Sequence, residues 1–165
     1  MEHYENISHT FTPVYDERSE ILILGTFPSV KSRENNFYYG HPQNRFWRVL
    51  AHVLGESVPT DIEEKRALLL RHRIALWDTV AACSVTGSAD AGIRDVVPND
   101  ISAILRTAPI RAIYTNGAKA HELYRRHILP STGIEDIKLP STSPANAAWS
   151  FERLCGEWAI ILRNG

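Results

Sequence analysis

Short apolar runs alternate with longer amphipathic segments along this chain. The runs are continuous and end at turn residues, which is typical of strands buried on both faces of a sheet. They cover residues 21–24, 74–80, 110–115 and 137–139. The segments between them have apolar residues at helical spacing, and they predict helices at residues 44–54, 61–73, 98–106 and 117–128, with one more after residue 147. This alternation predicts an α/β fold, one three-layer domain with a central, mostly parallel four-stranded sheet.

Two of the expected helices have distinctive ends or faces. Thr60 or Asp61 is placed to cap the helix at residues 61–73, because a short oxygen-bearing side chain there accepts a free N–H of the first turn. The last helix should turn Trp149, Leu154 and Trp158 toward the core. The Asn116-Gly117 pair is interpreted as a turn and helix cap.

Ligands of a parallel α/β sheet bind outside the carboxyl ends of its strands. In this chain those ends lie at residues 25–28, 78–83, 116–117 and 139–146, and a polar loop follows residue 83. The first of them opens a stretch of about 18 residues, 26–43, with no periodicity, and such loops in compact domains are often functional. It is rich in aromatic residues, which either stack on a base or pack as a lid. Phe46 and Trp47 fit a helix core, whereas both interpretations stay open for Phe27.

Composition narrows the class of protein. The 165 residues are 44% hydrophobic and 22% charged, which suits one domain over residues 1–165. No apolar run reaches the roughly 20 residues of a membrane helix, and the start of the chain is not typical of a signal peptide. Two cysteines are too few for a disulfide framework or a four-cysteine metal site, and no histidine pair has metal-binding spacing. We therefore expect a cytoplasmic monomer with no metal, no cofactor and no membrane contact.

Charge is distributed unevenly along the chain. Residues 1–20 form an acidic N-terminal extension with five carboxylates and one arginine, so the remainder is mildly basic although the whole has a net charge of −1. Four basic residues lie close together in the sequence, namely Lys31, Arg33, Arg45 and Arg48. Such a patch permits a phosphate-bearing partner, but by itself it favours a solvated face.

Three motifs lie at the expected strand ends, in the order GTFPSVKS (residues 25–32), FYYGHPQNRFW (37–47) and LPSTSPANA (139–147). Their order and spacing over about residues 21–158 resemble the uracil-DNA glycosylase superfamily, and most of all its hypoxanthine-DNA glycosylase branch. The resemblance implies a uracil-DNA-glycosylase-like fold. It also implies damaged DNA as the partner and base excision repair as the activity, with deoxyinosine as the preferred substrate.

Two positions depart from the common pattern of that superfamily. Phe27 stands where most members have a catalytic Asp or Asn, and Leu139 stands where most have a His or Asn that contacts the base. The hypoxanthine branch shares both departures, and its catalytic asparagine carries over to Asn44. The resemblance implies that Asn44 positions water, with its amide oxygen holding the water molecule. Its position alone would make it a helix cap.

The remaining site residues fall into two groups. The base-binding group comprises Gly25, Thr26, Phe27, Pro28, Tyr39 and Asp78. Within it Asp78 either accepts the N1–H of hypoxanthine or makes a structural hydrogen bond at its strand end. The expected DNA phosphate contacts are Ser29, Lys31, Ser32, Ser141, Thr142, Ser143 and Asn146. Ser143 followed by Pro144 is also a plausible helix start, and the two roles are compatible.

Three functions remain open on these residues. The first is a monofunctional DNA glycosylase that uses water as nucleophile and prefers hypoxanthine, with uracil as the alternative base. The second is a non-catalytic DNA-binding module, which Phe27 favours and which the NRFW segment and Asp78 disfavour. The third, a nucleoside hydrolase, would not need phosphate-binding loops at two strand ends.

Overall fold

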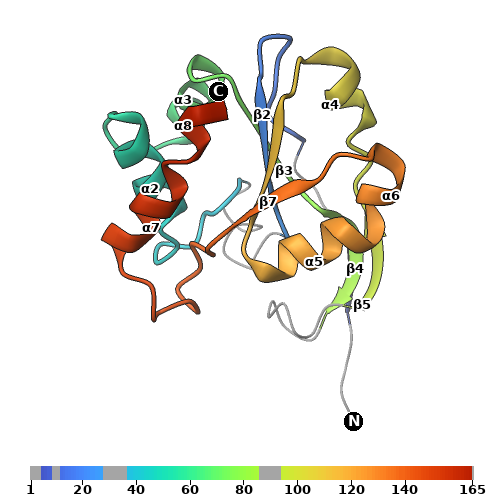
Figure 1. The fold of residues 1–165 in the computed structure, drawn as a ribbon. Helices are drawn as coiled ribbons and strands as arrows, with labels where there is room; N and C mark the ends of the chain where they lie inside the picture. The colour runs from blue at the N-terminus through green and yellow to red at the C-terminus, as the bar shows by residue number, and fades with distance from the viewer. Residues whose placement is uncertain (1–4, 9–11, 28–36, 86–93, 165) are drawn as a thin grey trace.

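The computed structural model describes residues 5–8, 12–27, 37–85 and 94–164. Its central sheet has four strands in the order β3-β2-β6-β7, and each neighbouring pair is parallel (Figure 1). The strands are β2 (Ile21–Gly25), β3 (Ile74–Asp78), β6 (Ala112–Asn116) and β7 (Asp136–Leu139). The predicted α/β fold with a parallel four-stranded sheet is therefore confirmed.

Helices cover both faces of this sheet, as Figure 1 shows. On one side lie α2 (Phe46–Leu54), α3 (Ile62–Arg71), α7 (Phe151–Trp158) and α8 (Ile161–Asn164). On the other lie α4 (Ser102–Thr107), α5 (Ala118–His127) and α6 (Leu129–Thr132). Strand β2 supplies both cores, because alternate side chains of a strand point to opposite faces. Ile21 and Ile23 belong to the first core, and Leu22 and Leu24 belong to the second.

Helix ends agree with the capping chemistry at some positions and differ at others. Asp61, not Thr60, caps α3, because its Oδ1 accepts the backbone N–H of Glu64 at 2.7 Å. Helix α7 begins only at Phe151, where Ser150 is the cap and accepts the N–H of Arg153. Trp149 therefore lies before α7, whereas Leu154 and Trp158 lie in α7 and are fully buried as expected.

A second sheet was not predicted. Strands β1 (Glu5–Ser8), β4 (Val80–Val85) and β5 (Arg94–Pro98) form it in the order β1-β4-β5, with both pairs antiparallel. The chain leaves β3 at Asp78 and enters β4 at Val80. Asn99 holds this junction, because its Nδ2 donates to the carbonyl oxygens of Asp78 and Val80. The apolar run at 74–80 is thus two strands, and the acidic extension contributes β1.

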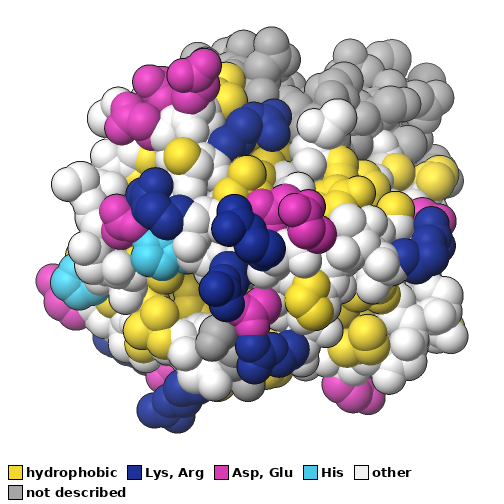
Figure 2. Space-filling model, turned by 90° about the horizontal axis from the view of Figure 1, so that it is seen from above, with side chains coloured by type: hydrophobic (Ala, Val, Ile, Leu, Met, Phe, Trp, Pro, Cys, Tyr) yellow, Lys and Arg dark blue, Asp and Glu magenta, His cyan; other side chains and the backbone are white. Residues whose placement is uncertain are grey.

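The amino edge of the central sheet is held by one buried carboxylate. Glu20, just before β2, accepts hydrogen bonds from the exposed guanidinium groups of Arg73 and Arg111, which precede β3 and β6. Seen from above, this side of the molecule has Lys and Arg side chains lying beside Asp and Glu (Figure 2). The mixed signs make it unlike a nucleic-acid surface. No helix in the described ranges is long and apolar enough to cross a membrane.

Candidate active site

Asn44 lies at the carboxyl edge of the sheet, in the turn that leads into α2. Its Oδ1 accepts two hydrogen bonds, one from the backbone N–H of Phe46 and one from the hydroxyl of Thr142, each at 2.9 Å. A carbonyl oxygen has two lone pairs, so the protein already occupies both. The side chain therefore presents its NH2 group. The expectation that the amide oxygen holds a water molecule does not fit this geometry, and the oxygen supports the start of α2 instead.

Thr142 is held in turn by Asn116, the last residue of β6. The backbone N–H of Thr142 donates to Asn116 Oδ1 at 3.1 Å, and Asn116 Nδ2 donates to Thr142 Oγ1 at 3.0 Å. Thr142 has no exposed surface and Asn116 is 8% exposed. The Asn116 side chain thus contacts the 139–147 loop directly, beyond the turn expected for it. Gly117 after it has a φ of 98° and is the N-cap residue of α5.

Arg45 joins the turn before α2 to residues 142–149 through its side chain and its backbone. Its guanidinium donates to the carbonyl oxygens of Trp149, Ser143 and Asn146, and its backbone N–H donates to the carbonyl of Thr142. A guanidinium has five N–H donors in a fixed plane, which suits several acceptors at once. Arg45 is therefore half-buried and engaged by the protein, so it differs from the solvated basic residue that its sequence neighbourhood suggested.

Gly25, Tyr39 and Asp78 come together at the ends of β2 and β3. A Cβ on Gly25 would lie 2.4 Å from Asp78 Oδ1 and 2.5 Å from the Tyr39 hydroxyl oxygen, so only glycine fits there. The Tyr39 ring stacks on Phe46 with centroids 4.1 Å apart. Phe46 thus connects Tyr39 at the β2 and β3 ends with Asn44, because its backbone N–H donates to Asn44 Oδ1. Burial, together with the nearby Asp78 carboxylate, raises the pKa of Tyr38 far above its ordinary value.

The first loop is only partly described. Thr26 is half-buried, and its carbonyl accepts the N–H of Val80 at 3.1 Å. The Phe27 ring is half-buried and packs on the small cluster of Val80 and Leu123, as in the lid interpretation. Four expected contacts lie outside the described residues, namely Pro28, Ser29, Lys31 and Ser32. Phe46 and Trp47, with exposures of 0% and 5%, are core residues as expected.

Hydrogen bonds within residues 141–146 shape this segment. Ser141 Oγ accepts the N–H of Ser143, and Ser143 Oγ accepts the N–H of Ala145. Asn146 Nδ2 donates to the carbonyl of Ser141 at 3.0 Å. These contacts form turns, and the expected helix start at Ser143 is wrong, because α7 begins eight residues later. Both serine hydroxyls are half-buried and keep a proton to donate.

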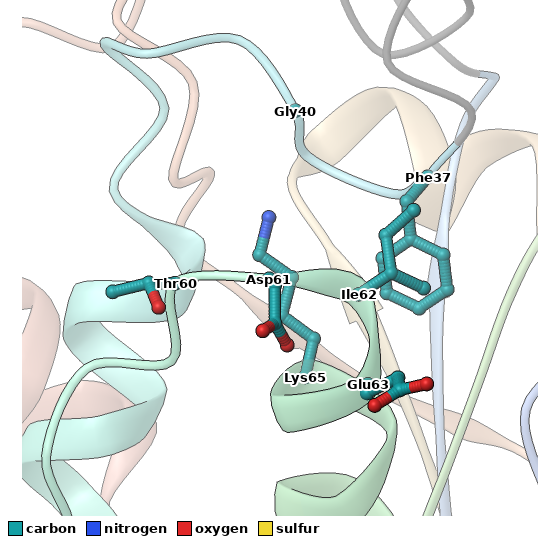
Figure 3. A pocket seen from close by; sticks show the side chains of 7 residues that line it. All are labelled: Phe37, Gly40, Thr60, Asp61, Ile62, Glu63 and Lys65. Atoms are coloured by element: carbon teal, nitrogen blue, oxygen red, sulfur yellow. The ribbon is translucent and has the colours of Figure 1, made fainter.

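A cavity of about 630 Å³ lies between residues 37–40 and the start of α3 (Figure 3). Asp61, Glu63 and Lys65 line it together with Phe37. Lys65 lies 5.4 Å from the centroid of the Trp47 ring, and burial lowers the pKa of its amine. None of Asn44, Asp78 and Thr142 lines this cavity, and its carboxylates do not suit a phosphate.

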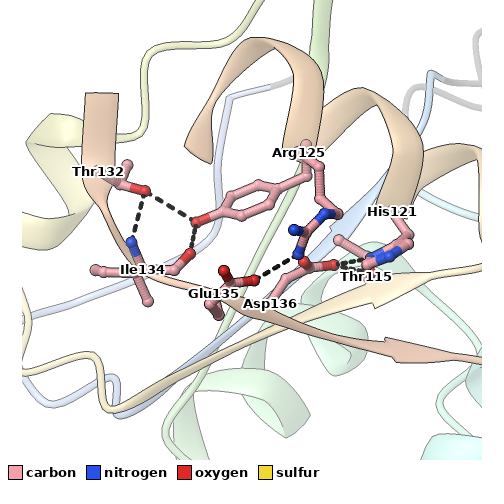
Figure 4. Close-up of polar contacts among 8 residues, drawn as sticks. Thr115, His121, Arg125, Thr132, Ile134, Glu135 and Asp136 are labelled. Atoms are coloured by element: carbon pink, nitrogen blue, oxygen red, sulfur yellow. Dashed lines mark hydrogen bonds and ion pairs between the residues drawn. The ribbon is translucent and has the colours of Figure 1, made fainter. Parts of the chain in front are cut away.

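A polar cluster on the other face of β6 serves the fold (Figure 4). The fully buried Asp136 carboxylate accepts the hydroxyl hydrogen of Thr115 and contacts Nδ1 of His121, both at 2.6 Å. Because neighbouring side chains of a strand alternate, Thr115 points away from the face that Asn116 uses. In the described part of the chain, no three His, Cys, Asp or Glu side chains could hold a metal ion together.

Sequence reasoning missed the roles of Arg45 and Asn116. Arg45 stands beside Asn44 in the NRFW segment, and only its partners, about a hundred positions away, distinguish it from the exposed Arg48. The sequence predicts only a turn and helix cap for Asn116, because Asn followed by Gly is a strong turn signal. Its place at a strand end was the available sign that it faces the site.

Comparisons with known proteins agree with the observed fold. A model of the "Uracil DNA glycosylase superfamily" matches residues 12–160. A protein of Methanosarcina acetivorans described as a hypoxanthine DNA glycosylase is 41% identical over 160 residues, which cover 96% of this chain and 99% of that protein. One of Methanosarcina barkeri with the same description is 38% identical, over 90% of this chain and 94% of the relative. A solution NMR structure from Methanosarcina acetivorans, described as a uracil DNA glycosylase, is 41% identical with a TM-score of 0.80, covering 94% of this chain and 96% of that one.

Proposed function

This chain belongs to the uracil DNA glycosylase superfamily, and from that membership we propose that it is a monofunctional DNA glycosylase that releases hypoxanthine from deoxyinosine. The relatives described as hypoxanthine DNA glycosylases align with nearly its whole length. The observation that carries the proposal is the Asn44 amide, which is fixed at the carboxyl edge of the sheet with its NH2 group presented. We further propose that it acts as a monomer on damaged DNA in the cytoplasm.

The reaction replaces the N-glycosidic bond with a bond to water. The bond from C1′ to N9 breaks, and its electron pair leaves with the base. The sugar is then cationic, so the attacking water needs a position more than it needs a strong base. Asn44 Nδ2 donates to the water oxygen and leaves the second lone pair directed at C1′. The water loses its proton to solvent, and the departing base takes one up.

Base choice follows from two side chains. Asp78 offers only acceptor oxygens when ionised, and it suits the N1–H of hypoxanthine. Leu139 is 3% exposed and belongs to the core on the α2 and α7 side, so no side-chain donor for a pyrimidine carbonyl stands at this position. Tyr39, whose hydroxyl lies beside Gly25, and the half-buried Phe27 are the aromatic residues proposed to contact a flipped base.

Phosphate contacts are proposed for two loops. Ser141, Ser143 and Asn146 lie in the loop that Arg45 ties to Asn44, and Ser29, Lys31 and Ser32 follow β2 in the sequence. Contacts to the backbone of DNA fix its register without reading its sequence. The two loops would hold the strand on either side of the extruded nucleotide.

A cleavage panel tests the proposal. Labelled duplexes with a single inosine, uracil, xanthine or undamaged adenine are incubated with excess protein, and abasic sites are then broken with alkali. Inosine should be released fastest, because mispaired bases also flip more easily. Uracil release without inosine release would reverse the choice of base, and binding with no release of any base would favour a non-catalytic module.

A further inference from the structure

We propose that Thr142, held by Asn116, is the positioning residue that fixes the plane of the Asn44 amide. The inference rests on the proposed function of Asn44 and adds a second layer to that site. Asn44 and Thr142 are 98 positions apart, and Asn116 comes from a third segment, the end of β6. The three side chains form one chain of hydrogen bonds that ends at the site.

The available hydrogens fix which atom donates and which accepts in each of these hydrogen bonds. The backbone N–H of Thr142 is an unambiguous donor, so Asn116 must turn its oxygen toward that N–H and its NH2 group toward Thr142 Oγ1. A hydroxyl has one hydrogen. Because Thr142 Oγ1 accepts from Asn116, it has that hydrogen free to donate, and it donates to Asn44 Oδ1 at 2.9 Å.

Two donors at one oxygen restrict Asn44 more than one donor does. The terminal torsion of an asparagine side chain is broad. The N–H of Phe46 alone would keep the oxygen inward and leave the amide plane free to rotate. With Thr142 as the second donor the plane is set, and the two hydrogens of Nδ2 point in fixed directions.

Burial decides between this role and the phosphate contact expected for Thr142. Its side chain is fully buried, and its hydroxyl contacts Asn44 and Asn116. A DNA phosphate has no approach to it. Thr142 acts through Asn44, whereas the neighbouring Ser141 and Ser143 remain candidates for the phosphate.

The test uses Thr142→Val, Thr142→Ser and a matched control. Thr142→Val keeps the shape and removes the hydroxyl, and Thr142→Ser keeps the hydroxyl. The control is Thr115→Val, because Thr115 is also fully buried but donates to Asp136 on the opposite face. Four quantities are measured on each variant: single-turnover release of hypoxanthine, duplex affinity, melting temperature and the NMR signal of the Asn44 side-chain NH2.

Both valine variants should melt at lower temperature, since each loses a buried hydrogen bond. Only Thr142→Val should lose rate, by about tenfold or more, because a misplaced positioning group affects the chemical step. Its duplex affinity should stay at the wild-type value and its Asn44 NH2 signal should move. Thr142→Ser should recover most of the rate and the wild-type NH2 signal.

Other results would overturn the proposal. A Thr142→Val rate within threefold of wild type removes Thr142 from positioning, and so does an unmoved Asn44 signal. Equal rate losses in Thr142→Val and Thr115→Val would reduce the effect to stability. If wild type releases no hypoxanthine, the proposed function fails, while the Asn44 signal still decides whether Thr142 sets the amide.

Discussion

Gly25 and Asp78 are register partners at the carboxyl ends of two adjacent parallel strands, and no side chain fits between them. A Cβ at residue 25 would stand 2.4 Å from Asp78 Oδ1, closer than real Cβ contacts come. The glycine is required here by the close approach of a carboxylate rather than by backbone conformation. The pair therefore fixes where the Asp78 oxygen stands relative to β2.

Gly25→Ala should impair the site more than the fold. The new methyl group must displace Asp78 or Tyr39, and overpacking of this kind destabilises by about 1–3 kcal/mol. We expect a clear fall in the single-turnover rate of hypoxanthine release. Urea unfolding of the same sample gives the free energy of unfolding for comparison. Gly156→Ala is the control, since nothing lies within 4 Å of a Cβ there and the position is helical. It should gain about 0.5–1 kcal/mol and keep its rate. Equal rates in the two variants would contradict the expectation.

Asn44→Asp separates the two ends of the Asn44 amide. Aspartate keeps an oxygen for Phe46 and Thr142 but replaces the NH2 donor with an acceptor. Because the protein occupies both acceptor positions of Asn44 Oδ1, the NH2 group is the part of the amide that we propose contacts water. We therefore expect a loss of at least about tenfold in single-turnover rate, which is 1.4 kcal/mol in the barrier, with melting temperature retained. Asn44→Ala should lose both the rate and about 0.5–2 kcal/mol of stability. An aspartate variant as fast as wild type would show that an acceptor suffices.

Arg45→Lys should loosen the loop that completes the site. An ammonium cannot reach the three carbonyl oxygens that the guanidinium binds, and unsatisfied carbonyls cost about 1–3 kcal/mol. Thermal unfolding should show the loss, and faster amide exchange should appear across residues 141–149. Arg48→Lys, at an exposed position in α2 just after Arg45, is the matched control. If both lysine variants melt alike, Arg45 does not tie the segments together.

DNA affinity should fall as salt rises, because phosphate contacts release counterions. Lys31→Ala should reduce the slope of log affinity against log salt by about one. Arg163→Ala is the control. It removes an exposed charge from α8, which lies beside Ile21 and Ile74 at the amino edge of the sheet, away from the proposed DNA contacts. The slope should therefore stay unchanged. Titrations of an inosine duplex at several salt concentrations give both slopes. A flat wild-type plot would argue against DNA as the partner.

Local sequence patterns predicted the central layer well because they depend on near neighbours. The burial of β2 on both faces reads directly from Ile21 to Leu24, and Asp61 needs only the helix that follows it. The second sheet escaped prediction because β1 and β4 recognise each other across more than seventy positions. Ser143 and Ser150 show a limit of local patterns, because either serine could cap a helix. The structure uses Ser150 as the cap of α7, whereas Ser143 accepts the N–H of Ala145 in a turn.

The positions of Asn44 and Asp78 in the fold were predictable from the sequence, and their hydrogen bonds were not. Asn44 and Asp78 came from motif and strand-end arguments, and both lie at the expected edge. The second donor to the Asn44 amide oxygen, Thr142, is 98 positions away, and the use of Arg45 depends on three distant carbonyl groups. Such contacts follow from the packing of α2 beside α7, which no local pattern encodes.

The distance along the chain between the Asn44 and Thr142 side chains has a consequence for protein synthesis. The ribosome makes residues 44 and 45 early, but their partners at 142–149 emerge about a hundred residues later. Trp158, whose indole donates to the carbonyl of Pro140, comes later still. Contacts this remote also form slowly, because a long loop must close first. An unfinished chain therefore holds Asn44 without the hydrogen bond from Thr142, and the proposed site is complete only when translation has passed the last helices.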